Sequence, residues 1–295
     1  MTGGEFHCGY IAIVGRPNVG KSTLLNRLVG LKLSITSRKP QTTRNLITGI
    51  VTRQQAQLIL VDTPGFQMHF SSILNRSMNR MVTQSLSNLD AVLIVVEALK
   101  YGAEDQRLIE LLPQKKPALL VINKIDRISD RKRLLPFIKR MSELKDFSEI
   151  VPISAAKGKG IEKLIEVTEK YLPQGPAIYA EDEITEASER FLAAELIREN
   201  IFRFLGDELP YVSMVIIDKF NEDQGLRRIF ASIIVDKESH KGIVVGVRGG
   251  RLKEIASKAR RDMEKLFNGK VFLEVWVKVR SGWADDERFL KRSGY

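Results

Sequence analysis

Predominantly apolar runs recur through the first half of the chain, and each ends in a polar turn. They span residues 10–14, 57–61, 91–96, 118–122 and 149–153. Runs that do not alternate with polar residues are typical of parallel strands buried on both faces. Stretches with helical spacing separate them, among them residues 23–29 and 75–89. This alternation predicts a doubly wound α/β sheet whose ligand lies at the carboxyl ends of the strands.

The pattern changes after residue 172. A Pro- and Gly-rich break at 172–176 and an acidic stretch as far as Glu186 predict a linker. The rest of the chain predicts the order helix, strand, strand, helix, helix, strand, which is an α+β sandwich of its own. Its main elements are a helix at 188–205, strands at 211–220 and 229–236, a helix at 252–267 and a strand at 271–279. The predicted organisation is therefore a first domain at 1–172, a linker at 173–187 and a second domain at 188–295.

Length and composition agree with two soluble domains. The 295 residues are enough for two cores, and no apolar run approaches the roughly 20 residues that span a bilayer. Cys8 is the only cysteine, which excludes an internal disulfide and favours a reducing compartment. The three histidines have no metal-ligand spacing.

Charge points to a polyanionic partner. The net charge is +11, and residues 240–295 alone contain 14 Lys and Arg against 7 Asp and Glu. Nucleic acid or an anionic membrane surface would attract such a segment.

Residues 15–22 read GRPNVGKS, between an apolar run and a helical run. In that context GxxxxGK[ST] predicts a phosphate-binding loop. Its glycines let successive N–H groups converge on one anion, and the following helix adds a partial positive charge there. Lys21 is expected to reach the β- and γ-phosphates and Ser22 to hold Mg²⁺. The residues expected to contact nucleotide here are Gly15, Arg16, Pro17, Asn18, Val19, Gly20, Lys21, Ser22 and Thr23.

Two further segments continue the same site. Residues 46–52 and 57–61 predict a hairpin, and the second strand runs directly into Asp62, Thr63, Pro64 and Gly65. An Asp at the carboxyl end of such a strand suits a Mg²⁺-linked role, and the N–H of Gly65 suits a γ-phosphate. The polar segment 34–44 before the hairpin is expected to be an exposed loop.

The sequence NKID at 123–126 predicts that the bound nucleotide carries guanine. The carboxylate of Asp126 accepts two hydrogen bonds from guanine N1–H and the 2-amino group, whereas adenine has no such pair of donors. Asn123 is expected to bridge to neighbouring loops or to the base, and the stem of Lys124 to lie along the base plane. Ser154 and Ala155, after the last apolar run, would support the base edge.

In the second domain, GVRG at 246–249 fits the GXXG loop of a KH domain, which clamps single-stranded nucleic acid. The glycines allow the backbone to approach phosphates, and a basic helix follows. The residues expected to contact RNA are Gly246, Val247, Arg248, Gly249, Gly250, Arg251, Lys253, Lys258 and Arg261, and Arg260 adds to the basic character of the helix.

Residues 10–172 resemble Ras-like GTPases of the translation-factor type. The resemblance implies that Thr42 or Thr43 supplies a second Mg²⁺ ligand, with Thr43 favoured, and that Lys21, Thr43, Asp62 and Gly65 support catalysis. It also reveals a departure, because Phe66 stands where such enzymes place a water-orienting glutamine and Gln67 is out of register. Slow intrinsic hydrolysis is therefore expected. Asn18 matches an asparagine that binds potassium in some relatives, so K⁺ is a candidate cofactor beside GTP, GDP and Mg²⁺.

The two domains together resemble the Era family of bacterial GTPases, through GRPNVGKS, QTTR, DTPG, NKID, SAAKG, ELPY and GVRGG. The resemblance implies a Ras-like domain followed by a type II KH domain that binds small-subunit rRNA near its 3′ end during ribosome assembly. It also implies a cytoplasmic protein, expected to be a monomer, with peripheral contact at the cell membrane.

Two other functions fit parts of the sequence. One is a nucleotide-gated module with negligible hydrolysis whose basic region binds protein or anionic lipid. The other is an assembly factor that uses ATP.

Overall fold

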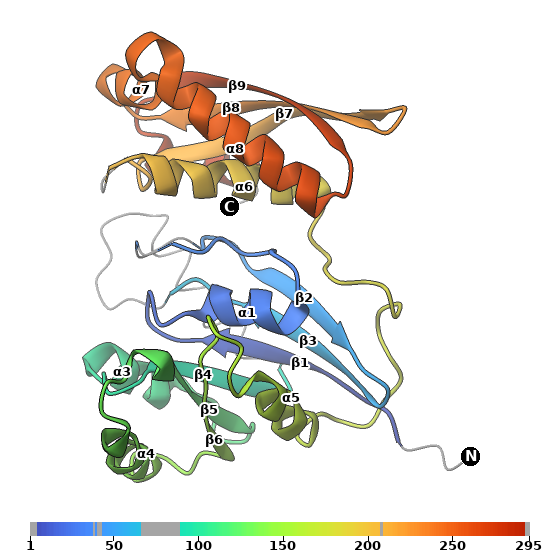
Figure 1. Ribbon diagram of the computed structural model, residues 1–295, viewed down its shortest axis with the longest axis vertical. Helices are drawn as coiled ribbons and strands as arrows, with labels where there is room; N and C mark the ends of the chain where they lie inside the picture. Colours follow the sequence, from blue (N-terminus) through green and yellow to red (C-terminus); the bar gives the residue numbers. More distant parts are fainter. Residues whose placement is uncertain (1–4, 38, 40–42, 66–88, 207–208, 293–295) are drawn as a thin grey trace. The chain divides into compact units, whose positions relative to one another are not determined.

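The computed structural model describes residues 5–37, 39, 43–65, 89–206 and 209–292 (Figure 1). The chain forms two compact units, and the main boundary between them lies at Glu186 and Ala187. The first unit contains a six-stranded sheet in the order β2-β3-β1-β4-β5-β6. Its strands are β1 (His7–Val14), β2 (Ile47–Thr52), β3 (Ala56–Asp62), β4 (Ala91–Glu97), β5 (Ala118–Asn123) and β6 (Glu149–Pro152).

All neighbouring strands of this sheet are parallel except β2 and β3, which form the predicted antiparallel hairpin. Strands β4 and β5 are buried along their whole length, as their continuous apolar sequences predict. The doubly wound prediction is confirmed. The carboxyl ends of β1, β3, β4 and β5 therefore meet at one edge of the sheet, where the predicted motifs begin.

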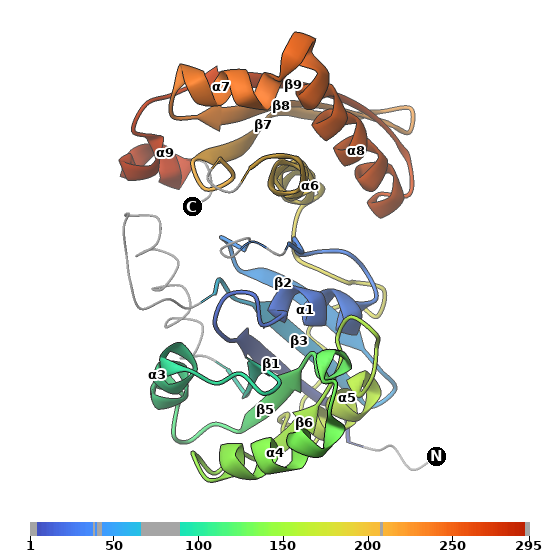
Figure 2. The ribbon, with the colours of Figure 1, turned by 60° about the vertical axis from the view of Figure 1, so that its left-hand side comes forward.

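Helices flank both faces of the sheet (Figure 1, Figure 2). Side chains of α3 and α4 pack with one face of β1, β4 and β5 in a single apolar core, to which Leu108 and Met141 belong. Helix α1 packs against β2 and β3 and contacts α5. The described helices are α1 (Lys21–Val29), α3 (Ala103–Leu111), α4 (Leu134–Ser142) and α5 (Ile161–Glu169), with short 3₁₀ turns at Ile125–Arg127 and Arg131–Arg133. Nearly all of the predicted helix at 75–89 lies outside the described residues.

The segment after α5 continues to hydrogen-bond with this sheet. The amide N–H of Ile50 in edge strand β2 donates to the carbonyl oxygen of Ile184 at 2.8 Å. The fully buried side chain of Gln57 accepts from the N–H groups of Ile178 and Tyr179 at 2.8 and 2.9 Å and donates to the carbonyl of Tyr179 at 2.9 Å. Residues 178–184 of the predicted linker are thus held against the sheet.

The second unit has a three-stranded sheet in the order β7-β8-β9, in which β7 and β8 are antiparallel and β8 and β9 parallel. Helices α6, α7 and α8 pack in one core with Ile229, Ala231 and Ile233, which share a face of β8. This is the predicted helix-strand-strand-helix-helix-strand order. Its elements are α6 (Glu189–Phe204), β7 (Ser213–Asp223), β8 (Leu226–Val235), α7 (Glu238–Val245), a 3₁₀ turn (Val247–Gly249), α8 (Gly250–Leu266), β9 (Lys270–Val279), a 3₁₀ turn (Trp283–Asp285) and α9 (Glu287–Arg292).

The hairpin between β7 and β8 is tighter than the sequence predicts. The polar residues Asn221–Asp223 are paired with Leu226–Arg228 and belong to the strand, so the turn is only Gln224–Gly225. Both turn residues have positive φ, 48° and 76°, as a two-residue hairpin turn of this hand requires. Exposure of this end of the strand lets it carry polar side chains.

Candidate functional site

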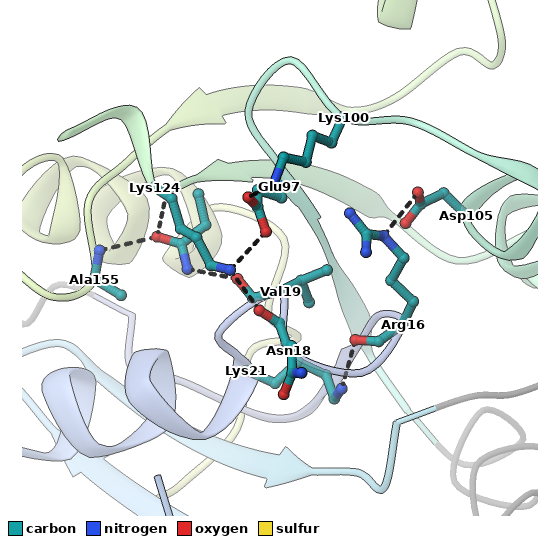
Figure 3. Close-up of polar contacts among 10 residues, drawn as sticks. Arg16, Asn18, Val19, Lys21, Glu97, Lys100, Asp105, Lys124 and Ala155 are labelled. Atoms are coloured by element: carbon teal, nitrogen blue, oxygen red, sulfur yellow. Dashed lines mark hydrogen bonds and ion pairs between the residues drawn. The ribbon is translucent and has the colours of Figure 1, made fainter. Parts of the chain in front are cut away.

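The loop at 15–20 curls between β1 and the start of α1, and Gly20 is essential to its path. Gly20 has φ of +105°, and a Cβ placed there would lie 2.4 Å from Nδ2 of Asn123. That amide in turn donates to the carbonyl oxygen of Val19 at 2.9 Å. The loop is therefore in direct contact with the residues predicted to select the base (Figure 3).

Lys21 is folded back over the loop. Its Nζ atom donates to the carbonyl oxygens of Gly15 at 2.9 Å and Arg16 at 3.2 Å. The side chain is buried, and burial lowers its pKa to about 8. A phosphate in the loop would favour the charged form of Lys21.

Four side chains with hydroxyl or carboxylate groups are hydrogen-bonded to one another beside the start of α1. The Ser22 hydroxyl donates to Oδ2 of Asp62 at 2.8 Å and lies 2.9 Å from the hydroxyl of Thr43. Ser34 also donates to Oδ2 of Asp62, whereas Oδ1 is buried without a hydrogen-bond partner among the described residues. Burial raises the pKa of Asp62. Oxygen ligands of this kind suit Mg²⁺, and the unpartnered buried Oδ1 indicates that a cation fits here.

The residues after Asp62 close on the phosphate loop. The Thr63 hydroxyl is buried and donates to the carbonyl oxygen of Ile13 at 2.9 Å. Pro64 is buried. A Cβ at Gly65 would lie 3.0 Å from the backbone of Pro17, so the two loops pack backbone to backbone.

On the base side, Asn123 joins three segments. Besides its bond to Val19, its Oδ1 accepts from the N–H groups of Lys124 at 2.7 Å and Ala155 at 3.0 Å. The Ser154 hydroxyl donates to Oδ1 of Asp126 at 2.5 Å. The predicted base-selecting residues thus lie together at the ends of β5 and β6.

Lys124 lies across the phosphate loop, where it contacts two further groups. Its Nζ atom donates to the carbonyl oxygen of Asn18 at 2.5 Å and to Oε2 of Glu97 at 2.6 Å (Figure 3). Glu97 ends strand β4 and also pairs with Lys100 at 2.7 Å. Sequence analysis did not single out Glu97, although an acidic residue at the end of an apolar strand is the same signal that identified Asp62.

The side chain of Arg16 is directed away from the phosphate loop (Figure 3). Its Nε atom pairs with Oδ2 of Asp105 in α3 at 3.1 Å. Only the backbone of Arg16 faces Lys21, and the side chain of Val19 is fully buried. At Arg16 and Val19, therefore, only backbone atoms are available for the predicted nucleotide contacts. Thr42, Phe66 and Gln67 lie outside the described residues.

The GXXG loop of the second unit connects α7 to α8. Gly246 has φ of +71°, and a Cβ there would lie 2.7 Å from Cβ of Arg251, so a side chain is excluded. Between the glycines, Val247 is 88% exposed and Arg248 is also exposed. Two side chains are thus presented to solvent directly before the N-terminus of α8.

The predicted basic residues divide into two groups along α8. Arg251 and Lys253 are exposed in its first turn. Lys258 pairs with Asp262 at 2.7 Å and Arg260 with Glu264 at 2.5 Å. Lys258, Arg260 and Arg261 lie roughly 12 Å or more from the first residue of the helix, Gly250, at a rise of 1.5 Å per residue. The first group is next to the GXXG loop and the second is not.

The fold and the two sites define a P-loop GTPase joined to a KH domain. Residues 10–124 match the model of a family described as a 50S ribosome-binding GTPase, and residues 208–284 match that of the KH domain. The chain is 55% identical to GTPase Era of Nitrosomonas eutropha over the full length of both, and 46% identical to GTPase Era of Bordetella pertussis, again over both full lengths. The chain belongs to the Era family and is a GTPase, which excludes the ATP-using alternative.

Solved structures agree over the whole fold. One is an Era variant from Aquifex aeolicus bound to GDP and AlF4⁻, and another is Era in complex with MgGDPNP and nucleotides 1506–1542 of 16S ribosomal RNA. Each is 39% identical to this chain, covers 98% of it and 99% of its own length, and superposes with a TM-score of 0.94.

Proposed function

We propose that this GTPase is a nucleotide-controlled RNA-binding switch that binds small-subunit rRNA near its 3′ end and acts in assembly of the small subunit. The RNA-bound Era structure supports the choice of RNA, since it contains nucleotides 1506–1542 of 16S rRNA. The GXXG loop with exposed Val247 and Arg248 supports the choice of site.

The observation that supports a nucleotide-controlled switch is the contact of Thr43 and Asp62 with Ser22. Thr43 precedes strand β2 and Asp62 ends β3, so two separate segments reach the phosphate loop at one point. A change in the γ-phosphate at that point would alter both segments. In this proposal Ser22, Thr43 and Asp62 hold Mg²⁺, which neutralises charge on the phosphate oxygens when bound.

Hydrolysis transfers the γ-phosphoryl group of GTP to water, and the bond from the γ-phosphorus to the bridging oxygen breaks. In this proposal Lys21 and the N–H groups of the loop stabilise the charge on that group, and the N–H of Gly65 donates a hydrogen bond to it. We name no side-chain base. Asn18, with φ of 64° in the loop, is the proposed K⁺ ligand.

Guanine selection is assigned to Asp126, with Asn123 holding Ala155 and Val19 around the base.

We also propose the division into a GTPase domain at 1–172, a linker at 173–187 and a KH domain at 188–295. A monomer in the cytoplasm with peripheral contact at an anionic membrane completes the proposal. Among the described helices, none combines the length and apolar character needed to cross a membrane.

The test is binding of the 3′ region of small-subunit rRNA in the presence of GDP and then of a non-hydrolysable GTP analogue. Tighter binding with the analogue, lost in a Gly246→Asp, Gly249→Asp double variant, supports the proposal. Equal binding in both states contradicts the switch. Binding of anionic vesicles that survives the double variant, without RNA binding, would favour the lipid-binding alternative. Salt dependence separates RNA binding from apolar adsorption.

A further inference from the structure

Three aromatic side chains share the face of the second unit's sheet that lies opposite helices α6, α7 and α8. Phe230 is on β8, and Phe272 and Trp276 are on β9. The pairing register places Phe230 beside Glu274, which lies on the same face of β9 as Phe272 and Trp276 and two positions from each of them. The core residues Ile229, Ala231 and Ile233 alternate with Phe230 along β8 and face the helices. The aromatic face is therefore separate from the GXXG loop, which adjoins the helices.

The aromatic rings are grouped and exposed. Phe272 and Trp276 each retain 43% exposure within the described part of the chain. The rings of Phe230 and Trp276 are nearly parallel, with centroids 6.1 Å apart and an interplanar angle of 15°, and those of Phe230 and Phe272 are 5.9 Å apart. A strand exposed to water has no packing reason to carry two such rings.

The charged residues of the same face suit a nucleic acid. Lys219 is in register with Phe230, and Arg228 with Phe272, and both basic side chains are exposed. Lys270 begins β9 on this face and is also exposed. Asp218 accepts from the Ser232 hydroxyl and lies 3.6 Å from the ammonium of Lys278, so its charge is compensated.

Glu274 lies between Phe272 and Trp276 along this face of β9, and Asp223 lies at its hairpin end. A carboxylate beside stacking rings accepts hydrogen bonds from the amino group of a base, as Glu does with cytosine N4. Glu274 therefore favours a base edge over a phosphate at the centre of the face, while Lys219, Arg228 and Lys270 provide positions for phosphates around it.

We propose that this aromatic face is a second RNA site, at which unpaired amino-bearing bases stack on Trp276 and Phe272. It rests on the RNA-binding function proposed above and adds a site outside the GXXG loop. A protein partner fits less well. Two rings at 43% exposure offer on the order of 100 Å² each, against about 800 Å² that a standard protein interface takes from each partner. Of the aliphatic side chains on this face, Met214 and Ile234 are buried, and Ile216 and Leu226 are half-buried.

The chain allows a direct optical test. Trp276 and Trp283 are its two tryptophans, and Trp283 is 1% exposed with its indole N–H donating to the carbonyl of Val212. Stacking of a base on the exposed indole would quench its fluorescence. The full-length protein would be titrated with a 12-nucleotide oligocytidine in the Gly246→Asp, Gly249→Asp background, which removes the GXXG site. Arg248→Glu serves as a second background in which both glycines are retained.

The proposal predicts saturable quenching in both backgrounds, and weaker quenching by a 12-nucleotide oligouridine, which lacks amino groups. By anisotropy of a labelled oligocytidine, Trp276→Ala and Phe272→Ala should each weaken this residual binding about tenfold, because stacking contributes strongly per base. Trp276→Phe should retain binding. Leu135→Ala, which removes an exposed apolar side chain in the other unit, is the matched control and should change nothing.

Three results would overturn the proposal. These are no quenching in either background, unchanged anisotropy binding in Trp276→Ala, or equal quenching by inorganic polyphosphate, which carries charge without bases. The outcome is separable from that of the switch. If RNA binding does not depend on the nucleotide but oligocytidine still quenches Trp276, only the switch is rejected. If RNA binding depends on the nucleotide but oligocytidine does not quench Trp276, only the aromatic site is rejected.

Discussion

The ammonium group of Lys124 is held between the carboxylate of Glu97, at 2.6 Å, and the carbonyl oxygen of Asn18, at 2.5 Å. The contact joins the end of β4, the base-selecting segment and the phosphate loop. Burial raises the pKa of Glu97, but hydrogen bonds from Lys100 and Lys124 outweigh it and hold that pKa below its usual value. The carboxylate is thus charged at neutral pH and fixes the position of Lys124.

Replacement of Glu97 by Gln should weaken GDP binding about tenfold, mainly through faster dissociation. The loss follows from a charge-assisted hydrogen bond that becomes neutral, at a cost of about 1.5 kcal/mol. Stopped-flow release of a fluorescent GDP analogue measures it. Lys100→Met removes the other, exposed partner of Glu97 and should leave the release rate nearly unchanged. Altered guanine preference in Glu97→Gln would contradict this account, because Asp126 is untouched.

The same substitution should change how stability depends on pH. Because the folded pKa of Glu97 is below its unfolded value, its contribution is fully present above about pH 4.5 and is lost as the pH falls through the folded pKa. Urea unfolding at several pH values should show Glu97→Gln less stable than the parent at pH 7, with the difference shrinking in the acid range. A constant difference across pH would mean that charge is not responsible.

Asp126→Asn should exchange the preferred base. An amide in place of the carboxylate accepts one hydrogen bond and donates another, which suits xanthine, whose C2 carbonyl replaces the amino group of guanine. GDP affinity should fall at least a hundredfold, and the xanthine analogue should then bind more tightly than GDP. Calorimetric titration with both nucleotides measures the exchange. Ser154→Ala removes the neighbouring hydroxyl and should preserve the preference for guanine.

Gly20→Ala should nearly abolish nucleotide binding. A methyl group there combines φ of +105° with a 2.4 Å approach to Nδ2 of Asn123, so the loop and the base-selecting segment must separate. Gly30→Ala is the matched control, because φ is +77° but no atom lies within 4 Å. Its cost should be about 1 kcal/mol of folding free energy with GDP affinity unchanged. Equal GDP affinity in both variants would contradict this prediction, because it would mean that the side chain of Asn123 can move away from a methyl group at position 20 without loss of binding.

The sequence predicts the parts of this molecule that are encoded locally. Strands β4 and β5 are continuous apolar runs, and the phosphate loop and NKID follow their strands directly, so their convergence follows from parallel topology. The paired residues Asn221–Asp223 were predicted as loop because polar composition dominates a short window. The contacts of Gln57 were not predictable, since its partners at 178 and 179 are more than 120 positions away.

The hydrogen bonds between Gln57 and residues 178–179 decide where the chain can be cut to obtain the first unit as a separate fragment. A chain cut after residue 172 would leave the buried amide of Gln57 without its backbone partners and uncover the edge of β2 that Ile184 occupies. Open strand edges pair with other chains, so such a fragment should self-associate. A fragment that ends at residue 186 retains the segment around Ile184 that covers the edge of β2, and it should sediment as a monomer.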